Sequence, residues 1–272
     1  MNWRQVAAVW RMEWKKTLLS KRGWWIYLLA LGPVFLTGMH SLVESRRHFS
    51  HHSLGEDSAV FAAMFQFFYL RGAIFFGCVG LFSNLFRGEM MEKTLHYYYM
   101  TPLRREILVA GKYLAGLTAA LLLFAGSTAV SYLLIGWHAG AAYTDYILHG
   151  PGLSQIEGYV VVAALACAGY GAIFMMTGLF TKNPMIAAAF VFVWEGINPF
   201  LPSVLQKLSI IFYLRNLAPV EVPVPPPLNV MVVAADPTPA WLAIGGLLAV
   251  SALLLMYTAM SARTSEISYS SE

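Results

Sequence analysis

Six long apolar stretches, separated by short polar segments, constrain the fold of this chain more than any other feature of its sequence. A bilayer core about 30 Å thick is crossed by about 20 apolar helical residues. Inside that core backbone groups must be paired within helices or closed barrels. The pattern predicts an all-α membrane protein with six transmembrane helices, at 24–42, 60–86, 112–136, 158–180, 185–200 and 240–260.

Composition leaves little room for a second domain. Of the 272 residues, 58% are hydrophobic and 12% are charged, and six crossings use roughly 120 residues. We therefore interpret 1–272 as a single transmembrane domain without a built-in ATPase of ordinary size. Cys78 and Cys167 both lie inside apolar stretches, where a disulfide framework is not expected.

The sequence motifs of enzymes are absent. The chain contains no Gly-x-x-x-x-Gly-Lys-Ser/Thr loop for ATP phosphates, no His-Glu-x-x-His metal motif and no Gly-x-Ser-x-Gly nucleophile motif. We expect no catalytic residues in this chain and no cofactor bound to it.

The distribution of Lys and Arg predicts the topology. Six of these residues precede the first apolar stretch, five lie in 87–112, and Lys182 and Arg263 fall on the same side; four fall on the other side. An excess of Lys and Arg marks cytoplasmic segments. We expect both termini in the cytoplasm, in a multi-pass protein of the bacterial inner membrane. Because the basic residues follow membrane sidedness, no nucleic-acid partner is expected.

Residues 2–22 have the pattern of an amphipathic helix. Bulky apolar residues recur at three- and four-residue spacing, while basic residues fall to one side. We expect this helix to lie in the membrane interface, either as a simple anchor or as a functional element. Its apolar residues are Trp3, Val6, Ala7, Trp10, Trp14, Thr17 and Leu18.

Two segments are expected on the outer face. The loop 137–158 carries no Lys or Arg and contains turn-forming Gly and Pro residues. The segment 201–239 is too polar at first to cross the membrane and then becomes proline-rich, which forbids a helix. We expect one or two short surface helices there, followed by an extended stretch.

The cytoplasmic stretch between the second and third apolar segments has a distinctive sequence. Charged residues and aromatics alternate in 88–99, which predicts a short amphipathic helix able to dock into a partner. Thr101 and Pro102 are suited to begin the next helix. The alternative is a solvated loop whose aromatic side chains rest among lipid headgroups.

This stretch resembles the first cytoplasmic loop of the type-2 ABC transporter permeases. The similarity lies in Gly88-Glu89, the run Glu92-Lys93-Thr94-Leu95, the turn Thr101-Pro102-Leu103-Arg104 and the pair Gly111-Lys112. Lys93 stands where the family commonly has glycine, and Leu103 where a small polar residue is common. The six spans, the preceding interfacial helix and the surface helices before the last span also fit the family.

The resemblance implies a function and partners. The chain would be a permease subunit that dimerises, with itself or with a second permease, and couples to a nucleotide-binding ATPase subunit that holds ATP and Mg²⁺. Export is the expected direction. Segment 88–99 would be the coupling helix, with the contact residues Gly88, Glu89, Glu92, Thr94, Leu95 and Tyr98.

Two charged residues fall inside apolar stretches, Arg71 in the second and Glu195 in the fifth. Charges at this depth are costly unless they are paired or hydrated. We expect both to face the protein interior and one another, near Gln66 and Asn198. The alternative is that Arg71 reaches to the outer surface and that Glu195 is paired locally.

Six of the seven histidines map to the outer side. His48, His51 and His52 form a compact group, which makes them candidate metal ligands.

Two other functions are compatible with the sequence. One is an ion-coupled secondary transporter that uses Arg71 and Glu195 as a relay. The other is a membrane scaffold or enzyme-maturation factor that uses the outer histidines. Because spans are apolar in any case, composition does not select a substrate.

Overall fold

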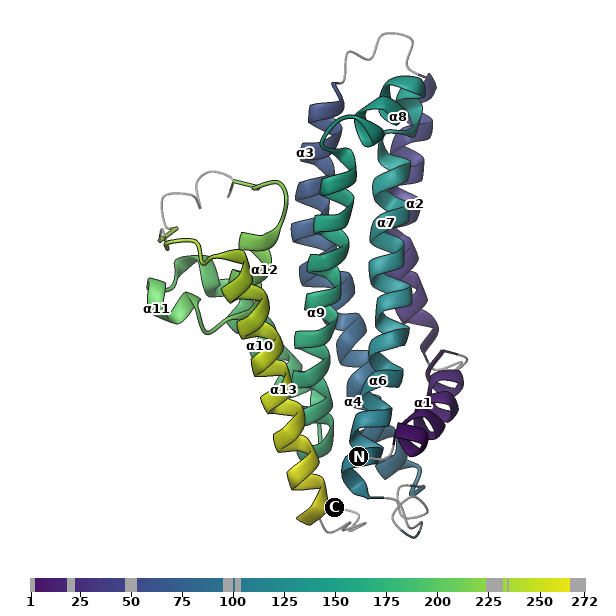
Figure 1. Ribbon diagram of the computed structural model, residues 1–272, viewed down its shortest axis with the longest axis vertical. Helices are drawn as coiled ribbons and strands as arrows, with labels where there is room; N and C mark the ends of the chain where they lie inside the picture. Colours follow the sequence, from purple (N-terminus) through teal and green to yellow (C-terminus); the bar gives the residue numbers. More distant parts are fainter. Residues whose placement is uncertain are drawn as a thin grey trace.

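The computed structural model describes residues 3–18, 23–46, 53–94, 100, 104–223, 232–233 and 235–264, and every regular element assigned in these ranges is helical. An upright bundle carries a smaller lobe on one side (Figure 1). We call the end of the bundle that holds the first helix the basal end, and the opposite end the distal end. The side lobe consists of residues 184–223 and 235–264.

Four long helical segments form the bundle. Helix α2 is Trp24–Arg46, and α9 is Gly152–Phe180. A second segment runs without a break through α3 (Leu54–Met64), the π-helix η2 (Phe65–Ile74) and α4 (Phe75–Met91). A third runs through α6 (Arg105–Ala120), the π-helix η3 (Leu121–Ala125) and α7 (Gly126–Ile135).

The predicted number of spans is not reproduced. Among the described residues, five helical segments are long and apolar enough to cross a membrane: Trp24–Arg46, Leu54–Met91, Arg105–Ala139, Gly152–Phe180 and Ala240–Arg263. The stretch predicted at 185–200 is a shorter apolar helix, α10 (Pro184–Ile197), followed by the 3₁₀ turn η5 (Asn198–Phe200). It is shorter because Asn183 caps its start and Pro199 interrupts helical pairing at its end.

The segment Leu54–Met91 is longer than a bilayer core is thick. Its 38 residues correspond to about 57 Å at 1.5 Å per residue, against a core of about 30 Å. Part of it therefore lies outside any hydrocarbon layer that the molecule spans.

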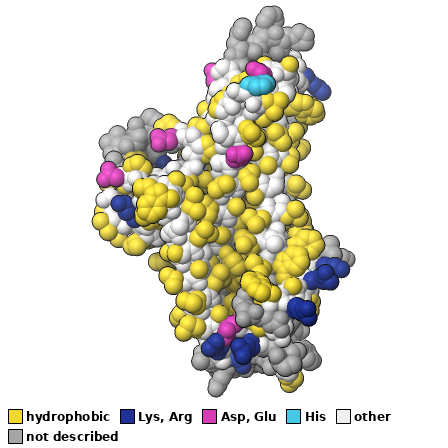
Figure 2. Space-filling model, viewed as in Figure 1, with side chains coloured by type: hydrophobic (Ala, Val, Ile, Leu, Met, Phe, Trp, Pro, Cys, Tyr) yellow, Lys and Arg dark blue, Asp and Glu magenta, His cyan; other side chains and the backbone are white. Residues whose placement is uncertain are grey.

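The bundle core is rich in aromatic side chains. Phe61 packs edge-on against Tyr132 and Tyr159, with ring centroids 4.9 Å apart in both pairs. Helices α4 and α9 approach closely where Gly178 meets Ser83, since a Cβ atom at 178 would lie 2.7 Å from the Ser83 carbonyl oxygen. The outer surface carries many exposed apolar side chains, whereas Lys and Arg gather at the basal end in the view of Figure 2.

Helix α1 (Trp3–Leu18) occupies the predicted amphipathic segment, but it lies against the bundle. Val6 and Val9 are buried, and the Trp10 indole N–H donates to the Thr118 hydroxyl on α6 at 3.0 Å. One face of α1 is thus packed on protein, while Trp3 stays exposed.

The two segments predicted on the outer face both contain short helices. The loop predicted at 137–158 contains the 3₁₀ turn η4 (Trp137–Ala139), helix α8 (Ala141–Leu148) and the start of α9. The short helices expected after 201 are present as α11 (Ser203–Gln206) and α12 (Ile210–Leu217). Helix α13 (Ala240–Thr264) then runs from the side lobe to the basal end (Figure 1).

Candidate functional site

Four charged side chains meet at the basal end, and we call them the basal ion network: Glu13, Lys16, Glu89 and Lys112. The Lys112 ammonium lies 2.7 Å from Glu89 Oε1 and 3.0 Å from Glu13 Oε1. Lys16 Nζ lies 3.0 Å from the same Glu89 oxygen. Lys112 is 0% exposed and both carboxylates are 2% exposed. The network therefore links α1, α4 and α6 through buried charge pairs.

Close helix packing explains why these charges are buried. Gly111 precedes Lys112 on α6, and a Cβ atom there would lie 2.6 Å from Val9 Cβ on α1. The absence of a side chain lets α1 approach α6, which brings Glu13 to Lys112. The Phe86 ring centroid lies 5.7 Å from the Lys112 ammonium and adds a cation–π contact.

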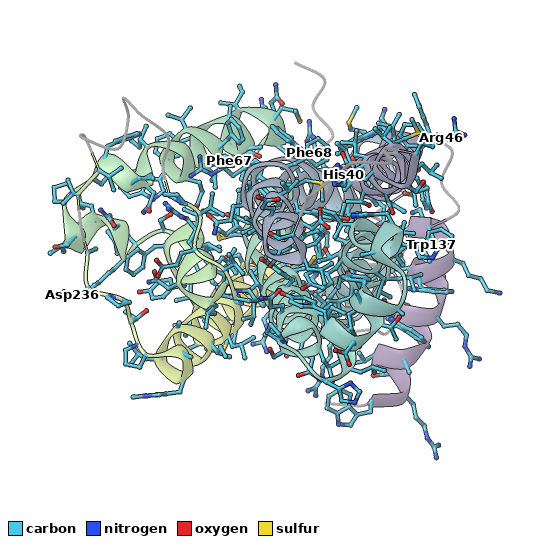
Figure 3. All side chains as sticks on the ribbon, turned by 90° about the horizontal axis from the view of Figure 1, so that it is seen from above. His40, Arg46, Phe67, Phe68, Trp137 and Asp236 are labelled. Carbon is cyan, nitrogen blue, oxygen red and sulfur yellow. The ribbon has the colours of Figure 1, made fainter. Side chains whose placement is uncertain are left out.

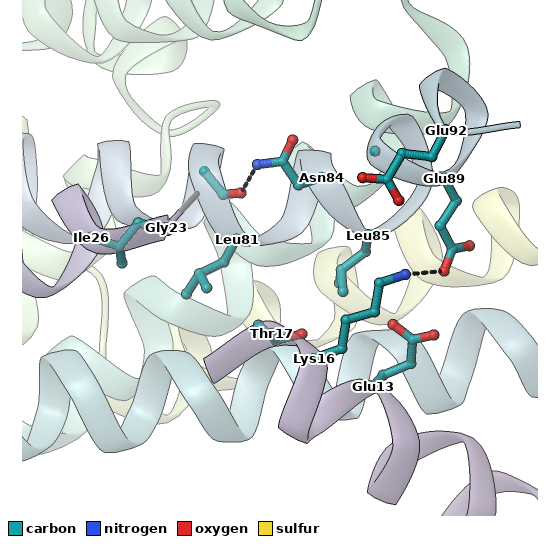
Figure 4. Close-up of a pocket in the computed structure, with 12 residues that line it drawn as sticks. Glu13, Lys16, Thr17, Gly23, Ile26, Leu81, Asn84, Leu85, Glu89 and Glu92 are labelled. Carbon is teal, nitrogen blue, oxygen red and sulfur yellow. Dashed lines mark hydrogen bonds and ion pairs between the residues drawn. The ribbon is translucent and has the colours of Figure 1, made fainter. Parts of the chain in front are cut away.

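A cavity of about 150 Å³ opens beside the network. It is bordered by α1, α2 and α4, and Glu92 joins Glu13, Lys16 and Glu89 in its lining. Figure 4 shows Lys16 reaching from α1 to Glu89, with Glu13 beside the pair. Three carboxylates thus surround the ammonium of Lys16.

These carboxylates favour the charged form of Lys16. Burial opposes its ammonium form, but Glu89, with Glu13 and Glu92, outweighs burial and raises the pKa of Lys16 above its ordinary value. Because the Lys16 side chain is 51% exposed, water screens this interaction, and its contribution to stability is that of a surface pair.

The first residues of the coupling helix predicted at 88–99 are part of α4. Gly88 and Glu89 belong to the last turn of α4, which is continuous with the preceding membrane segment. Glu89 points into the basal ion network, so its carboxylate is not on the surface. Glu92 ends α4, and the Thr94 N–H donates to the Glu89 carbonyl at 2.9 Å. Leu95 and Tyr98 lie outside the described residues.

Lys93 adopts a backbone conformation that favours glycine. Its φ is +56°, and it is the only non-glycine residue with positive φ among those described. The Lys93 N–H donates to the Met90 carbonyl while Thr94 donates to Glu89, which is the Schellman pattern of a helix C-terminus. In the type-2 permeases that this stretch resembles, glycine is common at the position of Lys93. The backbone conformation of Lys93 is one that glycine adopts readily.

Arg71 and Glu195 form no ion pair with one another in the described structure. The Glu195 carboxylate accepts hydrogen bonds from the Ser209 hydroxyl at 2.7 Å and from the N–H groups of Ile210 and Ile211 at 3.1 and 2.8 Å. It therefore caps the N-terminus of α12, where a negative charge is favoured. The Arg71 guanidinium lies 5.8 Å from the centroid of the Phe67 ring on η2.

The distal end brings together histidines other than the predicted group. His40 Nε2 and His138 Nε2 lie 3.4 and 3.6 Å from the two oxygens of the buried Asp57 carboxylate. Figure 3, seen from above, places His40 and Trp137 on the bundle and Asp236 on the side lobe. His48, His51 and His52 lie outside the described residues. Within the described ranges, no group of three or more His, Cys, Asp or Glu side chains is arranged to hold a metal ion.

Sequence reasoning missed three members of the basal ion network: Glu13, Lys16 and Lys112. Glu13 is an acidic residue within the basic segment 4–22, and Lys112 is a charge next to a long apolar stretch. Lys112 was a signal of burial, because a charge in an apolar stretch needs a partner, whereas Glu13 lies among basic residues and gave no such signal. Spacing along the chain did not show that the two residues would pair.

Comparisons with known proteins give no relative: no protein-family model and no curated protein matches this chain.

Proposed function

We propose that this chain is the membrane-spanning permease subunit of an ABC transporter and that its basal end receives the motion of a separate ATPase subunit. The observation that carries the proposal is the basal ion network, which joins the amphipathic helix α1 to the ends of α4 and α6. The resemblance of 86–114 to type-2 permeases names the class of partner.

The position of the network supports force transmission. The segment between Glu92 and Arg104 connects the end of α4 to the start of α6. Because α4, α6 and α1 share buried charge pairs, a push on this segment would move the three helices together. Three helices that move together would transmit the motion of a partner to the bundle.

A second set of contacts extends this path to the side lobe. The Arg105 guanidinium donates to the carbonyls of Ala262 and Arg263 at 2.8 and 3.0 Å, and Glu106 pairs with Arg263. The start of α6 is thereby tied to the end of α13. In the proposed cycle, closure of two ATPase subunits displaces these ends and changes the packing between two permease subunits, which opens a path for export.

Co-purification tests the proposal. The tagged chain is isolated from its native membranes in mild detergent, and the proteins bound to it are identified by mass spectrometry. The proposal predicts an ATPase of about 25–35 kDa, the size of one ordinary domain or slightly more, which is lost from Glu92→Lys/Leu95→Ala. Lys207→Gln on the side lobe should retain it. An extracytoplasmic protein in its place, with no ATPase, would favour the scaffold function.

A further inference from the structure

A second cavity, of about 490 Å³, lies between η2 and the side lobe. Its size is within the range of sites that bind small molecules. Apolar groups line it together with polar side chains from both parts of the molecule. The polar residues are Gln66, Asn198, Gln206, Arg215, Asn216 and Glu221.

Some of these polar side chains form hydrogen bonds within the cavity wall, and others do not. Gln206 donates to the carbonyls of Leu201 and Val233 at 2.9 Å, and Asn198 donates to the Gln206 carbonyl at 3.0 Å. By contrast, Arg215 and Glu221 make no hydrogen bond or ion pair with any described residue, although both line the same cavity. Within the described part of the chain, the cavity therefore presents a cation and an anion that interact through their charges alone.

The guanidinium of Arg215 is partly buried, and its surroundings disfavour its charge. Burial and the neighbouring charge of Arg71 lower the pKa of Arg215, and Glu221 only partly opposes them. A partly buried arginine normally has an anionic partner, and its planar donors match the oxygens of a phosphate. Glu221 is exposed at the cavity wall and is suited to accept hydrogen bonds from an ammonium group.

The depth of the cavity indicates where a ligand comes from. Ala235 lines the cavity, and α13 starts at Ala240 and runs to the basal end. The 25 residues of α13 span about 37 Å, which is the thickness of a hydrocarbon core with part of its headgroup region. A bilayer crossed by α13 would therefore place the cavity at headgroup level on the side opposite the basal end.

The two helices connected to the cavity-lining segments, α10 and α13, expose apolar side chains along their length. Helix α10 exposes Ile186, Phe190 and Val193, and α13 exposes Leu248 and Leu253 among others. Acyl chains can lie along such a surface while a polar headgroup enters the cavity.

We propose that this cavity binds a zwitterionic aminophosphate headgroup, supplied by a phospholipid of the phosphatidylethanolamine type, with its phosphate on Arg215 and Asn216 and its ammonium on Glu221. The site is separate from the basal ion network, and the proposal does not depend on an ATPase partner.

Thermal unfolding of the purified full chain in detergent tests the site. Dihexanoyl phosphatidylethanolamine should raise the unfolding temperature at lower concentration than dihexanoyl phosphatidylglycerol, which lacks the ammonium. Arg215→Gln should raise the half-maximal concentration for both lipids by about tenfold or more, as expected for a lost hydrogen bond to a charged group. Glu221→Gln, at an exposed position, should remove only the preference between the two lipids.

Two matched controls lie on the same lobe. Lys207→Gln and Asp236→Asn remove one charge each outside the cavity lining, and both should leave the lipid responses unchanged. Free phosphoethanolamine distinguishes the sources: a response equal to that of the lipid would assign the headgroup chemistry to a soluble ligand. Equal responses to the two lipids in the unaltered chain, or responses unaffected by Arg215→Gln, would overturn the proposal.

Discussion

At the scale of single residues, the buried ammonium of Lys112 has the largest predicted effect. Lys112→Met removes the cation that Glu13 and Glu89 share, and it leaves Glu89 with only the half-exposed Lys16. Breaking a buried pair in this way costs about 3–5 kcal/mol. We expect a large fall in the thermal stability of the detergent-solubilised chain.

A combined variant separates charge from packing at this position. Lys112→Met/Glu13→Gln/Glu89→Gln should recover much of the loss, because no uncompensated charge is then buried. Lys182→Met, in an exposed turn, should have little effect. No recovery in the combined variant would contradict the electrostatic account.

A substitution of Lys93 is predicted to raise the stability of the chain. A left-handed conformation costs a residue with a Cβ atom roughly 1–2 kcal/mol, and Lys93 has a φ of +56°. Lys93→Gly should therefore stabilise the end of α4 by about 1 kcal/mol, measurable as a higher unfolding temperature. Lys93→Ala keeps the Cβ atom and should give no such gain; equal gains from both variants would show that backbone strain is not the cause.

Lys16 predicts a pH dependence. Because its pKa is raised in the folded chain, its pairing with Glu89 stabilises the fold below the ordinary lysine pKa and is lost as the pH rises through the folded pKa. The difference in unfolding temperature between the unaltered chain and Lys16→Met should be present at pH 8 and should shrink as the pH rises past the ordinary lysine pKa and through the raised folded pKa. A difference that does not shrink as the pH rises would point to lost packing rather than lost charge.

At the scale of elements, the contact of α4 with α9 depends on Gly178. An added Cβ atom would meet the backbone of Ser83 at 2.7–2.8 Å, and backbone yields less readily than a side chain. Gly178→Ala should destabilise the chain by about 1–3 kcal/mol. Gly246→Ala, where no heavy atom lies within 4 Å, should be neutral or slightly stabilising. Comparable unfolding temperatures for the two variants would contradict the observed helix approach.

The elements also show what periodicity could and could not predict. Apolar length located the five long segments, and amphipathic spacing located α1, because both signals are local. The stretch predicted at 185–200 matches Pro184–Phe200, but this apolar segment is shorter than the five long ones. Periodicity gave no sign of the π-helical segments η2 and η3, which interrupt α-helical pairing without a proline.

The candidate site was predicted only in part, for a physical reason. Glu89 was singled out from its loop, but its burial depends on Lys112 and Glu13, which lie 23 and 76 positions away in the sequence. Arg71 and Glu195 were recognised as unusual, yet the partner of Glu195 is the start of α12. Partners of buried charges depend on tertiary packing, which spacing along one helix does not encode.

At the scale of the whole molecule, the two ends have different chemistry. The basal end holds the basal ion network and the exposed Met91 and Met100, whereas the distal end holds the Asp57–His40–His138 group. The proposed function predicts that an ATPase partner contacts the basal end and does not contact the distal end or the side lobe.

Site-directed photo-crosslinking in native membranes tests this central claim most directly. A photoreactive phenylalanine derivative replaces Met91, which is 73% exposed at the end of α4, or Leu208, which is 71% exposed on the side lobe. The account predicts that the residue at 91 is crosslinked to an ATPase subunit and that the one at 208 is not. Crosslinks to an ATPase from 208 but not from 91, or from neither position, would contradict it.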